Sequence, residues 1–124
     1  ILLDDIEKRQ KALIHGPLGA VLAQKKFKIT DEEILRAIKI HTTGDANMTR
    51  FDKVVFMSDF IEPRRSFPGV EELREKAFND LDDAVICAFD STIKYVIEKG
   101  SLLHPKTIQG RNFILIQRES EGML

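Results

Sequence analysis

Two polar side chains end consecutive helical segments of this sequence, and each continues an apolar row. His41 lies three residues after Ile38, in a segment that starts near Thr30, so the helical repeat places both residues on one face. Asp59 lies four residues after Val55 in the next segment. Burying a carboxylate without a partner costs several kcal/mol. An inward Asp59 therefore needs a cation, a hydrogen-bond network or a metal ion.

His15 is a third candidate ligand, before a third helical segment. Each residue taken alone also has an ordinary interpretation, because histidines at helix ends are commonly hydrogen-bonded and aspartates commonly cap helices. Metal sites need several N and O ligands that converge from different elements. Imidazole with carboxylate suits Mn, Fe, Co or Zn better than Ca or Mg. The sequence therefore predicts a transition-metal site from His15, His41 and Asp59, which could hold a phosphate ester and activate water.

The elements that position these residues are predicted to be helices. Residues 30–33 read Thr-Asp-Glu-Glu, a capping-box pattern that starts the helix ending at His41. Thr49 is the predicted cap of the next helix, which Pro63 prevents from continuing. No strand-type alternation occurs, so we expect one all-α domain over residues 1–124. Further helices are expected over residues 4–13, from Pro17 into the basic run 25–28, over 70–99 as one long helix ended by Gly100, and from His104 onward.

Composition narrows the function classes. The 124 residues suit one domain, and a hydrophobic fraction of 43% is not that of a disordered tail. With 19 basic and 20 acidic side chains the net charge is −1, which argues against nucleic-acid binding. No apolar run is long enough for a membrane span. The single Cys87 cannot form an internal disulfide, and a cytoplasmic location is expected.

Several motifs resemble those of a known family. Residues 40–44 read Ile-His-Thr-Thr-Gly, and residues 57–65 read Met-Ser-Asp-Phe-Ile-Glu-Pro-Arg-Arg. Together with the His-Gly-Pro at 15–17, they resemble the bacterial symmetrical diadenosine tetraphosphate hydrolases of the HD superfamily. The resemblance runs from about residue 15 onward. It implies an HD-domain-like helical bundle that uses two divalent metal ions, Fe, Mn or Co, to cleave dinucleoside tetraphosphate into two nucleoside diphosphates.

The resemblance also implies roles for individual residues. The implied metal ligands are His15, His41 and Asp59, of which His41 and Asp59 are the implied catalytic residues. Thr42 and Arg65 match positions near the substrate phosphates, and Glu62 is expected to orient Arg65 or a ligand. The implied partner is the nucleotide substrate, with neither nucleic acid nor membrane.

The sequence departs from this family in one respect. Such enzymes carry an earlier histidine and a His-Asp dipeptide, whereas the histidines here are His15, His41 and His104. We therefore expect this chain, which opens on Ile1 without a methionine, to be the C-terminal part, without the helices that carry the His-Asp pair. Apolar surface left by those helices would favour a homodimer. Two alternatives stay open: a catalytically silent helical module for binding or dimerisation, and an HD phosphohydrolase for another nucleotide.

Overall fold

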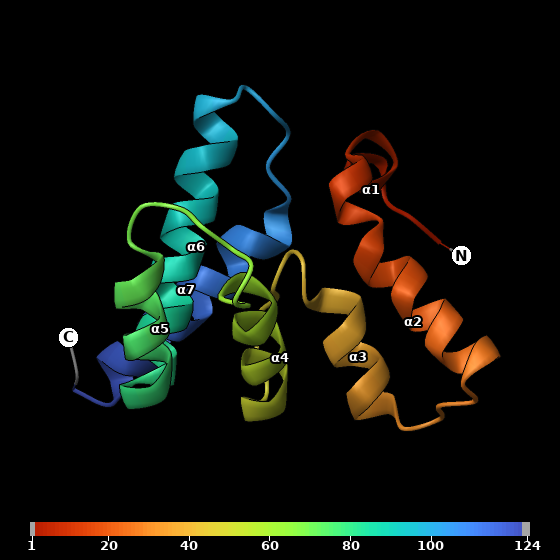
Figure 1. Cartoon of the computed structure of the whole chain (residues 1–124), viewed down its shortest axis with the longest axis horizontal. Coiled ribbons are helices and arrows are strands. Elements are labelled where there is room, and N and C mark those ends of the chain that lie inside the picture. The colour runs from red at the N-terminus through yellow and green to blue at the C-terminus, as the bar shows by residue number, and fades with distance from the viewer. Residues whose placement is uncertain (1, 123–124) are drawn as a thin grey trace.

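A computed structural model describes residues 2–122 of the chain, and its secondary structure there is helical (Figure 1). The elements, in order, are α1 (Asp5–Arg9), the short 3-10 helix η1 (Lys11–Leu13), α2 (His15–Lys26), α3 (Glu32–Ile40), α4 (Arg50–Phe60), α5 (Val70–Asn79), α6 (Leu81–Glu98) and α7 (Pro105–Ser120). No strand occurs among residues 2–122, which confirms the all-α expectation. Within that range, no helix combines the length and the apolarity that crossing a bilayer requires.

Side-chain caps set where the site-bearing helices begin. Asp31 caps α3, because its Oδ1 accepts the backbone N–H of Glu33 at 2.9 Å, so the helix starts one residue later than Thr30 predicts. Thr49 caps α4 as predicted, in a capping box with Asp52. In this box the Thr49 hydroxyl accepts the Asp52 N–H at 3.0 Å and the Asp52 carboxylate accepts the Thr49 N–H at 2.9 Å. The predicted cap therefore gives the start of α4 correctly, and the helix ends at Phe60.

The single long helix expected over residues 70–99 is wrong, because Asp80 divides it into α5 and α6. Asp80 has an extended backbone, and its carboxylate accepts the N–H of Asp83 at 3.1 Å, which caps α6. The same carboxylate pairs with the buried guanidinium of Arg118 on α7, 2.6 Å away. The hydrogen bond from Asp83 and the Arg118 charge lower the pKa of Asp80. Since the apolar period runs through the break, the periodicity alone gave no sign of it.

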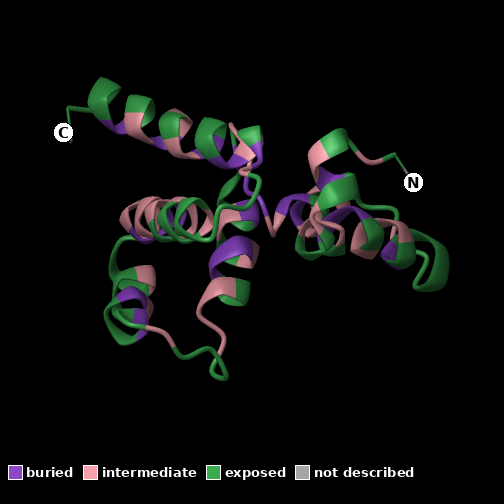
Figure 2. Cartoon of the chain, turned by 90° about the horizontal axis from the view of Figure 1, so that it is seen from above, coloured by how far each residue is buried: buried purple, intermediate pink, exposed green. Residues whose placement is uncertain are grey.

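The core is built around α6, which packs against α4, α5 and α7. Its Val85 and Phe89 are fully buried, and the ring of Phe89 lies 5.1 Å from the ring of Phe56 on α4. Ile114 of α7 belongs to the same buried cluster. Figure 2 shows the buried positions of the C-terminal helix along the side that faces the rest of the molecule. On the other side of α4, α3 packs against α4 and α2 packs against α3.

Candidate metal and phosphate site

The three predicted ligands lie at the ends of three consecutive helices. His15 is the first residue of α2, two residues before the predicted start, and His41 directly follows α3. Asp59 lies in the last turn of α4. The first turn of α2 and the last turns of α3 and α4 all point to the upper side of Figure 1. The helix directions therefore place the helix ends that carry these residues on the same side of α2, α3 and α4.

A close contact between α2 and α3 positions His15 relative to the end of α3. The neighbouring Gly16 is buried, and a Cβ atom there would lie 2.1 Å from the carbonyl oxygen of Lys39 and 3.3 Å from Oγ1 of Thr42. Only glycine permits this approach of two backbones. The packing thus explains the glycine of the His-Gly-Pro sequence, and it places His15 beside the segment that carries His41 and Thr42.

An ion pair between Arg36 and Asp52 joins α3 to α4. The Asp52 side chain is 1% exposed, and the second guanidinium nitrogen of Arg36 donates to the carbonyl oxygen of Ala46 at 3.2 Å. Arg36 therefore holds both the start of α4 and the connection that precedes it. These contacts fix the direction of α4 relative to α3, and with it the relation between the ends that carry His41 and Asp59.

The imidazole rings of His15 and His41 make the same kind of hydrogen bond. Nδ1 of His15 lies 3.1 Å from the carbonyl oxygen of Ala12, and Nδ1 of His41 lies 2.6 Å from that of Ile38. A carbonyl oxygen can only accept, so Nδ1 carries the proton in both neutral rings and Nε2 keeps a free lone pair. A histidine that donates one nitrogen to a carbonyl and leaves the other open is oriented as metal-binding histidines are.

Asp59 is not buried, contrary to the inward orientation expected from its spacing. Its side chain is 45% exposed, and Oδ2 lies 3.4 Å from the guanidinium of Arg65. The buried face of α4 passes through Phe56 and Met57, so the row of Val55 and Asp59 lies at the edge of that face. The carboxylate is consequently accessible to a ligand, and its present partner is a single long ion pair.

Arg74 of α5 organises the loop that follows α4, a role that the sequence patterns did not indicate. Its guanidinium donates to the carbonyl oxygens of Ile61 at 3.0 Å, Glu62 at 2.9 Å and Arg65 at 2.9 Å. One side chain therefore satisfies backbone acceptors on both sides of the turn. A lone arginine in an amphipathic helix gives no signal of such contacts, because they depend on how α5 folds back.

Glu62 pairs with Arg64, whereas Arg65 pairs with Asp59. Oε2 of Glu62 accepts the backbone N–H and the Nε–H of Arg64, each at 3.2 Å. The backbone hydrogen bond from Arg64 and the nearby guanidinium charges lower the pKa of Glu62. Of the predicted residues, the structure thus brings together Asp59 and Arg65. Glu62 was expected to orient Arg65, but its side chain contacts Arg64.

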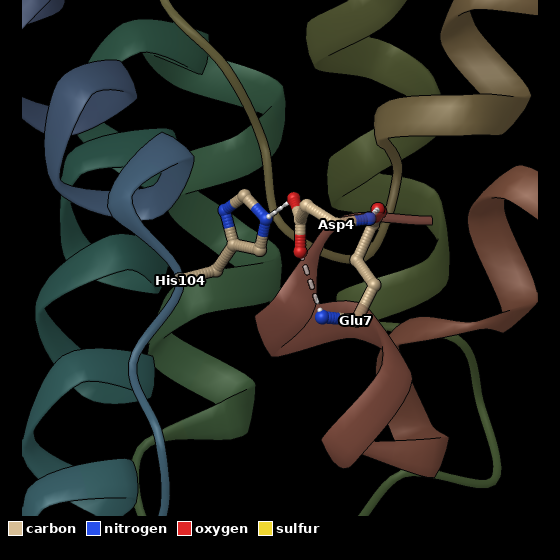
Figure 3. A group of neighbouring side chains, drawn as sticks. All are labelled: Asp4, Glu7 and His104. Atoms are coloured by element: carbon tan, nitrogen blue, oxygen red, sulfur yellow. Dashed lines mark hydrogen bonds and ion pairs between the residues drawn. The ribbon is translucent and has the colours of Figure 1, made fainter. Parts of the chain in front are cut away.

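A second histidine region, which the sequence patterns did not reveal, lies where α1 meets the start of α7 (Figure 3). Asp4, Glu7 and His104 have potential ligand atoms within 4.8 Å of one another, which His15, His41 and Asp59 do not. Nδ1 of His104 accepts the N–H of Lys106 at 3.1 Å, which caps α7. Nε2 must then carry the proton of the neutral ring, and it donates to Oδ2 of Asp4 at 2.6 Å. This ring has no free lone pair for a metal ion.

The carboxylates of this second region are also occupied. Asp4 and Glu7 form the capping box of α1, with hydrogen bonds of 2.8 Å and 3.0 Å. Burial raises the pKa of Asp4, but the hydrogen bonds from Glu7 and His104 outweigh it and lower that pKa. The group is therefore a structural link between the start of α1 and the start of α7.

Comparison with known proteins identifies relatives that align with most of this chain. Over 107 residues the chain is 39% identical to the protein named "Bis(5'-nucleosyl)-tetraphosphatase, symmetrical" of Halalkalibacterium halodurans, covering 86% of this chain and 57% of that protein. Over 103 residues it is 40% identical to the Bacillus subtilis protein of the same name, covering 83% and 55%. The chain is a homologue of these symmetrical tetraphosphatases. It spans little more than half of their length.

A solved structure extends this homology to the fold. The crystal structure of a Clostridium acetobutylicum protein, described as a predicted HD superfamily hydrolase involved in NAD metabolism, matches with a TM-score of 0.89 and 45% identity. The match covers 94% of this chain and 62% of that one. The HD-domain-like helical fold and the resemblance seen in the motifs are confirmed. No protein-family model matches the chain.

Proposed function

We propose that the protein, as a whole, hydrolyses a dinucleoside tetraphosphate such as diadenosine tetraphosphate into two nucleoside diphosphates. Relatives that are 39% and 40% identical are named for this activity. The observation that carries the proposal is the shared orientation of His15 and His41, whose Nδ1 atoms are bonded to carbonyl oxygens, so that the lone pair of each neutral ring is on Nε2. His15 begins α2 and His41 follows α3, and in Figure 1 these helix ends lie on the same side of the three helices as the last turn of α4, which carries Asp59.

The donor set fits a divalent transition metal. Two imidazole nitrogens and one carboxylate suit Fe, Mn or Co, and three ligands leave positions for water and substrate. When bound, two such ions would supply an activated water for attack on phosphorus and would neutralise the charge of the leaving oxygen. The ligands that we assign from this chain are His15, His41 and Asp59.

We assign Arg65 and Thr42 to the substrate phosphates. A guanidinium presents paired donors to paired oxygens, and the 3.4 Å pair of Arg65 with Asp59 is long enough for a phosphate to replace it. The Thr42 hydroxyl lies next to Gly16, at the contact between α2 and the end of α3. Arg74 keeps the backbone of Arg65 in place, and we assign to Glu62 the positioning of this loop through Arg64.

The test is incubation of the full-length protein with diadenosine tetraphosphate and Mn²⁺ or Fe²⁺, followed by separation of the nucleotides. We expect ADP as the nucleotide product, loss of turnover with a chelator and recovery when metal is added back. Formation of ATP with AMP would contradict symmetric cleavage. Turnover that a chelator leaves intact would contradict the metal assignment.

A homodimer and a cytoplasmic location stay predictions. Phe27 is 74% exposed, and an apolar side chain at such a position is available for contact with a second copy. Light scattering over a dilution series of the full-length protein measures the molar mass. A mass of one chain at all concentrations would contradict the homodimer.

A further inference from the structure

A cavity of about 540 Å³ lies between the loop after α4 and the second half of α6. Its volume is within the range of small-molecule sites. Phe60, Phe67 and Tyr95 supply aromatic walls, and Arg65 and Lys94 supply positive charge. Because Arg65 also pairs with Asp59, this cavity opens beside the proposed metal ligand. The rings of Phe60, Phe67 and Tyr95 take no part in the contacts described for the metal site.

A second cavity of about 320 Å³ adjoins the first. Thr92 and Tyr95 line both cavities, so this part of α6 is a shared wall. Thr42, which follows His41 in sequence, lines the second cavity, whereas Arg65 lines the first. Thr42 and Arg65, which we assign to the phosphates, therefore line two cavities that are separated by Thr92 and Tyr95 of α6. That arrangement suits a long polyphosphate with a nucleoside at each end.

Tyr95 is the aromatic residue of the wall that is available to a ligand. Phe60 and Phe67 already pack edge to face, with ring centroids 5.5 Å apart. Tyr95 is 57% exposed, and the ammonium of Lys99 lies 5.2 Å from its ring centroid. An exposed ring next to cations offers a stacking surface for a base and charge for the attached phosphates.

We propose that the cavity lined by Phe60, Arg65 and Tyr95 binds one nucleoside of the substrate, with the base stacked on Tyr95. The phosphates then run past Arg65 toward Asp59. This inference rests on the proposed function and assigns its nucleoside site. Arg65 and Lys94 outnumber the one carboxylate in the lining, that of Glu98. This net positive charge and the hydroxyl groups of Ser91 and Thr92 favour a nucleotide over an apolar segment or a second copy. Since every base has a π face, stacking predicts weak discrimination among bases.

Fluorine NMR tests the stacking directly, because Tyr95 is the only tyrosine among these 124 residues. The full-length protein is labelled with 3-fluorotyrosine, and the Tyr95 resonance is identified by its loss in Tyr95→Phe. We expect ADP to shift this resonance to saturation and inorganic pyrophosphate to leave it in place. In Arg65→Gln the ADP titration should weaken, whereas the adenosine titration should not change. A resonance that ADP does not move, or that moves only with protein concentration, would overturn the proposal.

Kinetics separate this inference from the proposed function. We expect Tyr95→Ala to raise KM for diadenosine tetraphosphate by about tenfold with little change in kcat, because a stacked base contributes to binding on that scale. Tyr95→Phe should keep the wild-type KM. The matched control is Phe78→Ala, which removes an 88% exposed ring outside the cavity and should change nothing. Hydrolysis with an unaltered KM in Tyr95→Ala overturns the cavity alone. Absence of hydrolysis overturns the proposed function, while the NMR titration still tests the cavity.

Discussion

His41 and His104 each sit at a helix boundary, but their rings are used in opposite ways. Nδ1 of His41 donates to a carbonyl oxygen and leaves Nε2 open. Nδ1 of His104 accepts a backbone N–H, so its Nε2 proton goes to Asp4. The tighter cluster of potential ligand atoms surrounds His104, yet the free lone pair belongs to His41. Proximity of ligand-type residues is therefore a weaker sign of a metal site than the direction of the unused lone pair.

The end of the helix at which each histidine lies explains the difference. The first turn of a helix has N–H groups without a partner in the helix, and the last turn has carbonyl oxygens without a partner in the helix. His104 precedes α7 and accepts, while His41 follows α3 and donates. His15 is the first residue of α2, but it also follows the short helix η1, which contains its hydrogen-bond partner Ala12. It therefore donates to a carbonyl oxygen, as His41 does. The fold thus sets which nitrogen stays open in each ring.

The largest effect that separates the two regions should come from removing each imidazole in turn. We expect His41→Gln to lower kcat/KM for diadenosine tetraphosphate by more than about 100-fold, because even residues that only support metal ligands account for 10–100-fold effects. His104→Gln should leave kcat/KM nearly unchanged. Steady-state kinetics and the metal content of each purified variant measure this. A large loss in His104→Gln with little change in His41→Gln would contradict the metal assignment and would place the ion in the His104 region.

The contact between α2 and α3 should give the next largest effect. We expect Gly16→Ala to lower the free energy of unfolding by about 1–3 kcal/mol, the usual cost of overpacking, because its Cβ would meet the backbone of Lys39. Metal affinity should fall with it, since His15 would move relative to His41. Urea unfolding and metal titration measure the two quantities.

Gly19→Ala is the matched control on the same helix. Its Cβ would meet only the side chain of Ile38, at 3.1 Å, which can shift, and alanine is the better helix former. We expect little change in the free energy of unfolding. Equal losses in Gly16→Ala and Gly19→Ala would show that the close backbone contact is not what positions His15.

The smallest effect should come from Asp4→Asn, which keeps a good N-cap but removes the charge opposite His104. We expect a loss of unfolding free energy of at most about 1 kcal/mol near neutral pH, with metal affinity unchanged. Because the folded pKa of Asp4 lies below its usual value, its contribution is present above the unfolded pKa. It is lost as pH falls through the folded pKa.

Urea unfolding of the wild type and of Asp4→Asn as a function of pH measures this dependence. The difference between the two proteins should vanish in acid. A difference that persists below the folded pKa would mean that the Asp4 charge is not the source. A change in metal affinity would mean that the Asp4 region holds the ion.

The sequence predicted what depends on near neighbours. Thr49 caps α4 through Asp52, three residues on, and Gly100 follows α6 with a φ of +68°. The HD-type fold was also predicted, from motifs that resemble a known family, and the solved structure confirms it. The break at Asp80 was missed, because it is stabilised by Arg118, 38 residues away.

Contacts between distant residues also explain what was missed at the site. The hydrogen bond between Asp4 and His104 joins residues 100 positions apart, and the bonds from Arg74 to the loop after α4 depend on the fold of α5. The exposure of Asp59 depends on which face of α4 meets α6. The extent of the domain as 1–124 and the roles of the site residues stay predictions.

Long-range proton–nitrogen correlation spectra of the histidine rings give the most direct test of the central claim, which is that His15 and His41 have open Nε2 atoms and His104 has none. At a pH above the ordinary histidine pKa, we expect Nδ1–H tautomers for His15 and His41 and an Nε2–H tautomer for His104. Zinc, as a diamagnetic substitute, should shift Nε2 of His15 and His41 and leave His104 in place. Nε2–H tautomers at His15 and His41, or a zinc shift confined to His104, would contradict the claim.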